Sequence, residues 1–185
     1  MKYIESLREG ERINEIYLCK VKQSALTKAG KPYDTLKVYN SVLNMYNYYV
    51  KCDELAQIPN EKGKIKNKYR SANSKTILAE RPNLINGGIQ YFNLNKNEDA
   101  LKYFAAYVDA ATLPMMEKEN LLEKDTILPQ VAYYATLAAD RVGDKDAVMK
   151  YAQYALKDKE NGQFAMQLLT DAYKAKGDTA KWVEK

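Results

Sequence analysis

The stretch Ala100-Leu-Lys-Tyr-Phe-Ala-Ala-Tyr107 has the same pattern as Ala147-Val-Met-Lys-Tyr-Ala-Gln-Tyr154. In both, a small residue is followed at helical spacing by an aromatic residue and then by a tyrosine. A second match joins Gly143-Asp144 to Gly177-Asp178, which lie 34 residues apart, the period of a helix-turn-helix repeat. The sequence therefore predicts an all-α array of helical repeats.

The two aromatic stretches are further apart than one repeat. They are separated by 47 residues, and the difference, 47 − 34 = 13 residues, predicts an insertion after Pro114. Insertions in repeat arrays map to loops on one face. This one begins with Met115 and Met116, which either cap the preceding helix pair or provide an adaptable hydrophobic contact.

The composition is that of a globular, mostly helical protein. Of the 185 residues 46% are apolar and 16 are tyrosines, enough to bury a core. The net charge of +5 is confined to residues 61–75, which hold six cations against Glu61, and the rest of the chain sums to zero. The segment from Lys62 to Lys75 is either a solvated linker or helix face, or a contact for phosphate or nucleic acid.

Histidine is absent from the chain, and the only cysteines are Cys19 and Cys52. The missing histidine excludes His-based acid/base catalysis, Ser-His and Cys-His pairs, and His-ligated metal sites. Two cysteines are too few for a disulfide framework. They are either buried free thiols, or a single disulfide, or they include a reactive thiol. We therefore expect no catalytic residue, no bound metal, no cofactor and no enzyme activity.

The amino terminus lacks the apolar run of a signal peptide. No stretch is long and apolar enough to span a bilayer. The residues of this chain therefore predict a cytoplasmic location by default.

The residues before the repeats predict one strand and two helical stretches. Residues 12–22 combine β-branched and aromatic residues in partial alternation, which is typical of a strand. After Asp34, a good N-cap, apolar residues recur at intervals of three and four as far as Leu55, predicting a long helix that Pro59 ends. A second helical stretch follows over 69–80.

From Pro82 onwards the helices are predicted to pair, in repeats over 82–114, 128–161 and 162–185. Pro82 is expected to open the first of these helices, in the first turn, where its missing N–H costs nothing. Gly87 and Gly88 cost helix propensity, about 1 kcal/mol each. Their expected role is to let the partner helix approach closely, because a missing Cβ draws backbones together.

The later repeats depart from the first. The second has a turn at Gly143 that is one residue shorter. In the third, Trp182 and Val183 begin an answering helix that the chain does not complete. Because solenoids need capping elements, we expect an exposed apolar C-terminal end, through which a homodimer could form.

The helical part of the chain resembles the tetratricopeptide repeat family. Gly88, Tyr91, Ala100 and Phe104 fit the family signature, and Pro114 lies two residues beyond the usual proline. The second repeat departs from the signature, with alanine where an aromatic residue is usual. The resemblance to uncharacterised bacterial tetratricopeptide proteins covers about residues 33–185. It implies a right-handed superhelix that acts as a protein-interaction scaffold, in a family whose members can carry export signals.

The first 36 residues have a different resemblance. Glu11 to Val21 and Gly30 to Leu36 are similar to the opening of the OB-fold domain of HD-type 3′ to 5′ exoribonucleases. Such a barrel needs about five strands, whereas this chain turns helical after the first, and the HD half would need histidine ligands. We therefore predict an incomplete OB-like segment over 1–33 joined, as a chimera, to a helical repeat domain over 34–185.

The concave face of a solenoid, lined by the first helix of each pair, is its usual binding surface. Helical spacing places eight side chains on that face, and we call them the predicted groove: Asn86, Gln90, Asn93, Tyr133, Asp140, Gln167, Asp171 and Lys174. These side chains either bind a peptide backbone or form a solvated face. Other tyrosines at helical spacing are expected to be interhelix core rather than a ligand platform.

The sequence thus predicts a non-catalytic scaffold that binds a peptide or protein partner in the predicted groove. The alternative is a nucleic-acid-binding module, which would use the OB-like N-terminus and the basic segment 62–75.

Overall fold

The computed structural model describes residues 34–177, and over these residues the protein is all-α, without a strand. The helices are α1 (Thr35–Ala56), α2 (Arg70–Asn93), α3 (Asn97–Asp109), η2 (Ala110–Thr112), η3 (Pro114–Glu119), α4 (Leu121–Lys124), α5 (Leu128–Val142), α6 (Lys145–Ala155) and α7 (Gly162–Ala175). The predicted strand over 12–22 and the predicted answering helix at Trp182 lie outside the described residues.

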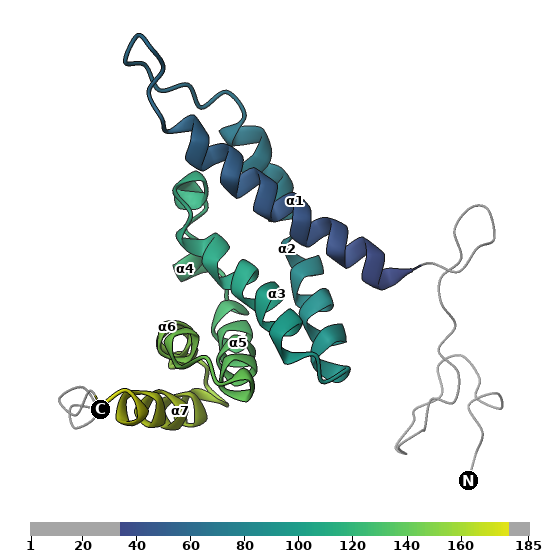
Figure 1. The fold of residues 1–185 in the computed structure, drawn as a ribbon, viewed down its shortest axis with the longest axis vertical. Coiled ribbons are helices and arrows are strands. Elements are labelled where there is room, and N and C mark those ends of the chain that lie inside the picture. Colours follow the sequence, from purple (N-terminus) through teal and green to yellow (C-terminus); the bar gives the residue numbers. More distant parts are fainter. Residues whose placement is uncertain (1–33, 178–185) are drawn as a thin grey trace. The chain divides into compact units, whose positions relative to one another are not determined.

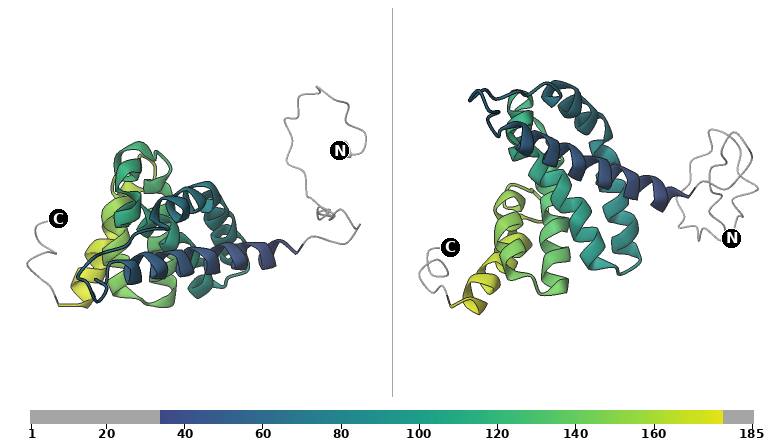
Figure 2. Two further views of the ribbon diagram at one scale, coloured as in Figure 1. Left: turned by 90° about the horizontal axis from the view of Figure 1, so that it is seen from above. Right: turned by 45° about the horizontal axis from the view of Figure 1, so that its top comes forward.

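The long helices pack mainly on their neighbours in the chain. Helix α2 contacts α1 and α3, and α5 contacts α3 and α6. Helix α7 packs on α6 and also reaches back to α5 (Figures 1 and 2). One apolar cluster runs from α1 through α2, α3 and α5 to the start of α7, so these helices share a core.

Helix α1 follows the predicted stripe over most of its length. Val42 and Tyr46 are buried against the core, as their spacing predicts. Leu55 does not belong to the stripe, because 55% of its surface is exposed. At this end the helix is held by charge instead, since Arg70 at the start of α2 donates Nε and Nη2 to the two carboxylate oxygens of Asp53, at 2.7 and 2.8 Å.

The prediction that Pro82 opens a helix is wrong, because α2 runs from Arg70 to Asn93 with Pro82 in its interior. A proline there removes one backbone hydrogen bond and costs about 3 kcal/mol. The helix continues because it is anchored on both sides of the proline. Ile77 and Leu84 are each 1% exposed, and burying one such side chain contributes about 1.5–3 kcal/mol.

Close approach at the paired glycines is confirmed. A Cβ added to Gly87 would lie 2.6 Å from Cδ1 of Tyr103, and one added to Gly88 would lie 2.6 Å from Cδ1 of Phe104. Both rings belong to α3 and are 1% exposed. The helix propensity lost at the two glycines is therefore offset by two aromatic side chains buried against the α2 backbone.

The shorter turn of the second pair is also confirmed. Leu94, Asn95 and Lys96 connect α2 to α3, with Asn95 left-handed at φ 57°. Only Gly143 and Asp144 connect α5 to α6. Gly143 is left-handed at φ 79°, and the side chain of Asp144 accepts the N–H of Ala147, capping α6.

The prediction that the inserted residues 115–127 form a loop is wrong. They contain most of η3 and all of α4, which pack against the core. Met116 is fully buried, and Met115 is 6% exposed. The hydroxyl of Ser74 on α2 donates to Sδ of Met116 at 3.3 Å. The methionines therefore belong to the main apolar core and Met116 contacts α2, which agrees with the first of the two predicted roles, a cap on the preceding helix pair.

Candidate partner-binding surfaces

The eight residues of the predicted groove lie on α2, α5 and α7, and none of them is buried. Those on α2 are Asn86, Gln90 and Asn93, those on α5 are Tyr133 and Asp140, and those on α7 are Gln167, Asp171 and Lys174. Gln90, Tyr133 and Asp140 are half-buried, and the rest are exposed. All eight side chains are therefore open to solvent, on the three helices from which a groove was expected.

Part of this surface is held rigidly from beneath. The ring of Tyr133 lies 5.7 Å from that of Tyr134, which contacts Phe92 of α2 and Phe104 of α3 at 6.1 and 5.8 Å. Arg141 lies over the Phe92 ring at 4.2 Å. This aromatic cluster joins three helices, so Tyr133 is a preorganised contact surface.

The charge of Asp140 is partly neutralised. Its carboxylate accepts Nζ of Lys145 at 2.8 Å, and both side chains are about one third exposed. A partner that pairs with Asp140 has to compete with this lysine. The exposed amides of Asn86, Asn93 and Gln167 leave donors and acceptors at the protein surface.

A buried charged cluster surrounds Arg81 and was not among the predicted sites. Its guanidinium, 5% exposed, donates Nη1 to Asp125 at 2.6 Å and Nε and Nη2 to the carbonyl of Tyr107 at 3.2 and 3.0 Å. The guanidinium stacks 3.7 Å from the Tyr107 ring centre, and the Tyr107 hydroxyl donates to Asp125 at 2.8 Å. One signal was present in the sequence, because Arg81 interrupts the apolar stripe of Ile77 and Leu84.

The Arg81 cluster is a structural tie rather than a reactive site. Asp125 also accepts the N–H groups of Ile127 and Leu128, which anchors the start of α5. A cavity of about 320 Å³ opens beside the cluster, but the Arg81 donors already have partners. The cluster joins α2 to the end of α3 and the start of α5, and so ties together two of the three helices that carry the predicted groove.

The core role predicted for the tyrosines is confirmed for the buried ones. Burial raises the pKa of Tyr46, Tyr103, Tyr107 and Tyr151 well above the ordinary value of 10. Their hydroxyls therefore stay protonated at pH values at which a solvated tyrosine ionises, and those of Tyr103, Tyr107 and Tyr151 donate hydrogen bonds. Tyr103, for example, donates to Oδ1 of Asn40 on α1 at 2.7 Å.

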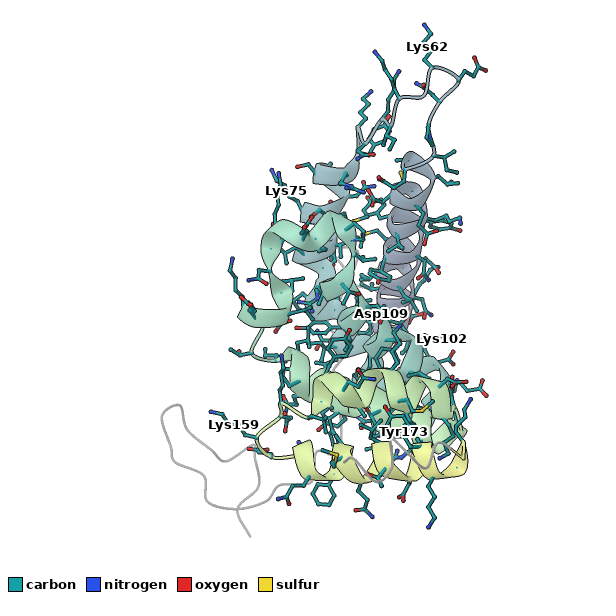
Figure 3. All side chains as sticks on the ribbon, turned by 90° about the vertical axis from the view of Figure 1, so that its left-hand side faces the viewer. Lys62, Lys75, Lys102, Asp109, Lys159 and Tyr173 are labelled. Atoms are coloured by element: carbon teal, nitrogen blue, oxygen red, sulfur yellow. The ribbon has the colours of Figure 1, made fainter. Side chains whose placement is uncertain are left out.

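The connection between α1 and α2 is the most basic surface of the described residues. All residues from 57 to 69 are exposed, and they include Lys62, Lys64, Lys66 and Lys68 against one acidic residue, Glu61. We call residues 57–69 the basic loop. It extends past the ends of both helices, with Lys62 at its tip (Figures 1 and 3).

No protein-family profile, curated protein or solved structure matches this chain. The resemblance to tetratricopeptide proteins therefore stays a prediction, and what is established is an all-helical protein over the described residues. Within residues 34–177 no group of three or more Cys, Asp or Glu side chains is arranged to hold a metal ion. In the same range no helix combines the length and apolar character needed to cross a membrane.

Proposed function

We propose that the protein is a non-catalytic interaction scaffold whose helices form a tetratricopeptide-like, right-handed solenoid. The observation that carries the proposal is the order of the helix contacts. Helix α5 packs on α3 and α6, and α7 packs on α6 and α5, so each pair touches the next and the first helices of the last two pairs, α5 and α7, also meet. This is the nearest-neighbour stacking expected of a solenoid.

The groove of such a scaffold is formed by the eight predicted residues on α2, α5 and α7. Exposed amides at Asn86, Asn93 and Gln167 suit the N–H and C=O groups of an extended peptide. Tyr133 offers a flat, fixed apolar surface that loses little entropy on binding. Asp171 and Lys174 add charges of both signs, so the partner that fits best is an extended peptide of mixed polarity.

Selection of a random linear peptide library against the purified chain tests this proposal. A selected peptide should shift the backbone amide resonances of α2, α5 and α7. The double variant Asn93→Ala/Gln167→Ala should weaken its binding at least tenfold, with an unchanged far-UV circular dichroism spectrum, because both side chains are exposed.

The matched control is Lys102→Ala/Gln153→Ala, which alters exposed positions of α3 and α6. The control should bind like the wild type. Selected peptides that lose affinity with the control variant, and keep it with the groove variant, would place the binding surface on the second helices and overturn the proposal.

A further inference from the structure

The basic loop is built around one asparagine. Oδ1 of Asn60 accepts the N–H groups of Lys62 and Lys64, both at 3.0 Å, and the N–H of Asn60 donates to the carbonyl of Lys64 at 3.0 Å. Gly63 takes the left-handed conformation, φ 68°, that this tight turn requires. The loop therefore has a defined tip.

The two sides of the loop lie against each other. Nε2 of Gln57 donates to Oδ1 of Asn67 at 3.1 Å, below the contact between Asn60 and Lys64. Ile58 on one side and Ile65 on the other lie between these two contacts. They are 65% and 52% exposed, so two aliphatic side chains are held out into solvent near one tip.

The four lysines of the loop differ from several lysines elsewhere in residues 34–177. Lys102, Lys145, Lys150 and Lys176 are each 2.8 Å from a carboxylate. Lys62, Lys64, Lys66 and Lys68 form no ion pair with any carboxylate among residues 34–177. Their charges are thus available to an anionic partner.

We propose that the basic loop docks on the surface of an anionic lipid bilayer, with its lysines at the lipid phosphates and Ile58 and Ile65 inserted among the headgroups. A lipid surface takes up both classes of side chain, because apolar area and cationic charge act together in interfacial binding. The loop also has the shape for a flat partner, since every residue of it is exposed and it projects past both helices (Figure 3).

Two other anionic partners fit less well. Single-stranded nucleic acid is bound by several aromatic side chains that stack on its bases along a basic groove. The loop has one aromatic residue, Tyr69, and its two exposed isoleucines cannot stack on bases. An acidic peptide would pair with the lysines but offers no apolar contact for the exposed Ile58 and Ile65. The lipid surface alone accounts for the isoleucines, the lysines and the projection.

Co-sedimentation of the full chain with vesicles tests the proposal. The chain should bind vesicles of two parts phosphatidylcholine to one part phosphatidylglycerol, and not vesicles of phosphatidylcholine alone. Each lysine near an anionic surface contributes about fivefold in affinity. Replacing all four lysines of the loop with glutamine should therefore weaken binding by at least about a hundredfold, and added salt should weaken the wild type.

Two further variants separate the lipid surface from other polyanions. Ile58→Ser/Ile65→Ser should weaken vesicle binding by about tenfold or more, because each isoleucine loses its apolar burial, and should keep the salt dependence. Lys157→Gln/Lys159→Gln, which removes two exposed lysines from the α6–α7 connection, should bind like the wild type (Figure 3). The proposal is overturned if the serine variant binds vesicles normally, or if the chain binds poly(U) but not the anionic vesicles.

Discussion

The α2–α3 pair and the α5–α6 pair solve one packing problem in two ways. In α2–α3 the backbones approach at Gly87 and Gly88, and the aromatic rings of α3 fill the space against them. Helices α5 and α6 contain no glycine, and their fully buried small residues are alanines: Ala132, Ala135, Ala138 and Ala139 on α5, and Ala152 and Ala155 on α6. A small-residue interface therefore does not require glycine, but one that accepts an aromatic ring directly over the backbone does.

The pairs also differ in how charge is used. Arg81 of α2 is almost completely buried and bridges to the end of α3 and the start of α5. The corresponding ion pair of α5 and α6, Asp140 with Lys145, is about one third exposed and joins only those two helices. The first pair thus has a buried ion pair that reaches beyond the pair itself, whereas the ion pair of the second is local and partly solvated.

The largest difference between the pairs should appear when each loses its cation. Arg81→Met should lower the free energy of unfolding by about 3–5 kcal/mol, since it leaves Asp125 and the Tyr107 carbonyl without their buried partner. Lys145→Met should cost about 0–1 kcal/mol, because its ion pair is partly solvated. Urea denaturation followed by circular dichroism measures both values.

Arg81→Lys serves as the second variant if Arg81→Met does not fold. It keeps the charge but loses the forked hydrogen bonds and the stacking on Tyr107, so its stability should lie between those of the wild type and Arg81→Met. Equal losses for Arg81→Met and Lys145→Met would show that burial does not distinguish the two ion pairs.

The next largest effect concerns the small residues. Gly88→Ala should destabilise by about 1–3 kcal/mol, because its methyl group would overlap the ring of Phe104. In α5 the reverse change, Ala135→Gly, should cost about 1 kcal/mol, mainly through helix propensity. The two substitutions act in opposite directions on volume, and both should lower the midpoint of thermal unfolding.

A smaller ring partner distinguishes overlap from propensity. The double variant Gly88→Ala/Phe104→Leu should be less destabilised than the sum of its two single changes, by at least about 0.5 kcal/mol, as expected for residues in contact. Strict additivity would mean that the added methyl group does not meet the Phe104 ring.

Local spacing was sufficient to predict much of the helical core. The pattern of Ala100, Phe104 and Tyr107 placed these side chains on the buried face of α3, and the glycines opposite them marked the contact. The prediction at Pro82 was wrong because a local rule was applied where tertiary packing decides: Ile77 and Leu84 hold the helix on both sides of the proline. The inserted residues were predicted to form a loop for a similar reason, because a general rule on insertions does not show that Met115 and Met116 are buried and that short helices form around them.

The candidate surfaces were only partly readable from the sequence. Helical periodicity predicted which polar side chains of α2, α5 and α7 would stay unburied, but not that Lys145 would pair with Asp140. The link from Arg81 to Asp125 spans 44 positions of the chain and depends on a fold that periodicity does not specify. The charge of the basic loop was visible in the sequence, whereas its rigid tip depends on the hydrogen bonds of Asn60.

The smallest expected effects lie in the turns, where the two pairs use different residues for the same left-handed conformation. Gly143→Ala should cost about 1 kcal/mol, because nothing lies within 4 Å of the added Cβ and the penalty is that of the backbone alone. Exchanging the two solutions, by Gly143→Asn or by Asn95→Gly, should change stability by less than about 0.5 kcal/mol, since asparagine and glycine both adopt this conformation. Urea denaturation of the three variants tests this order. A loss for Gly143→Asn as large as that for Gly143→Ala would show that the two-residue turn requires glycine itself, and that the α5–α6 connection is the less adaptable of the two.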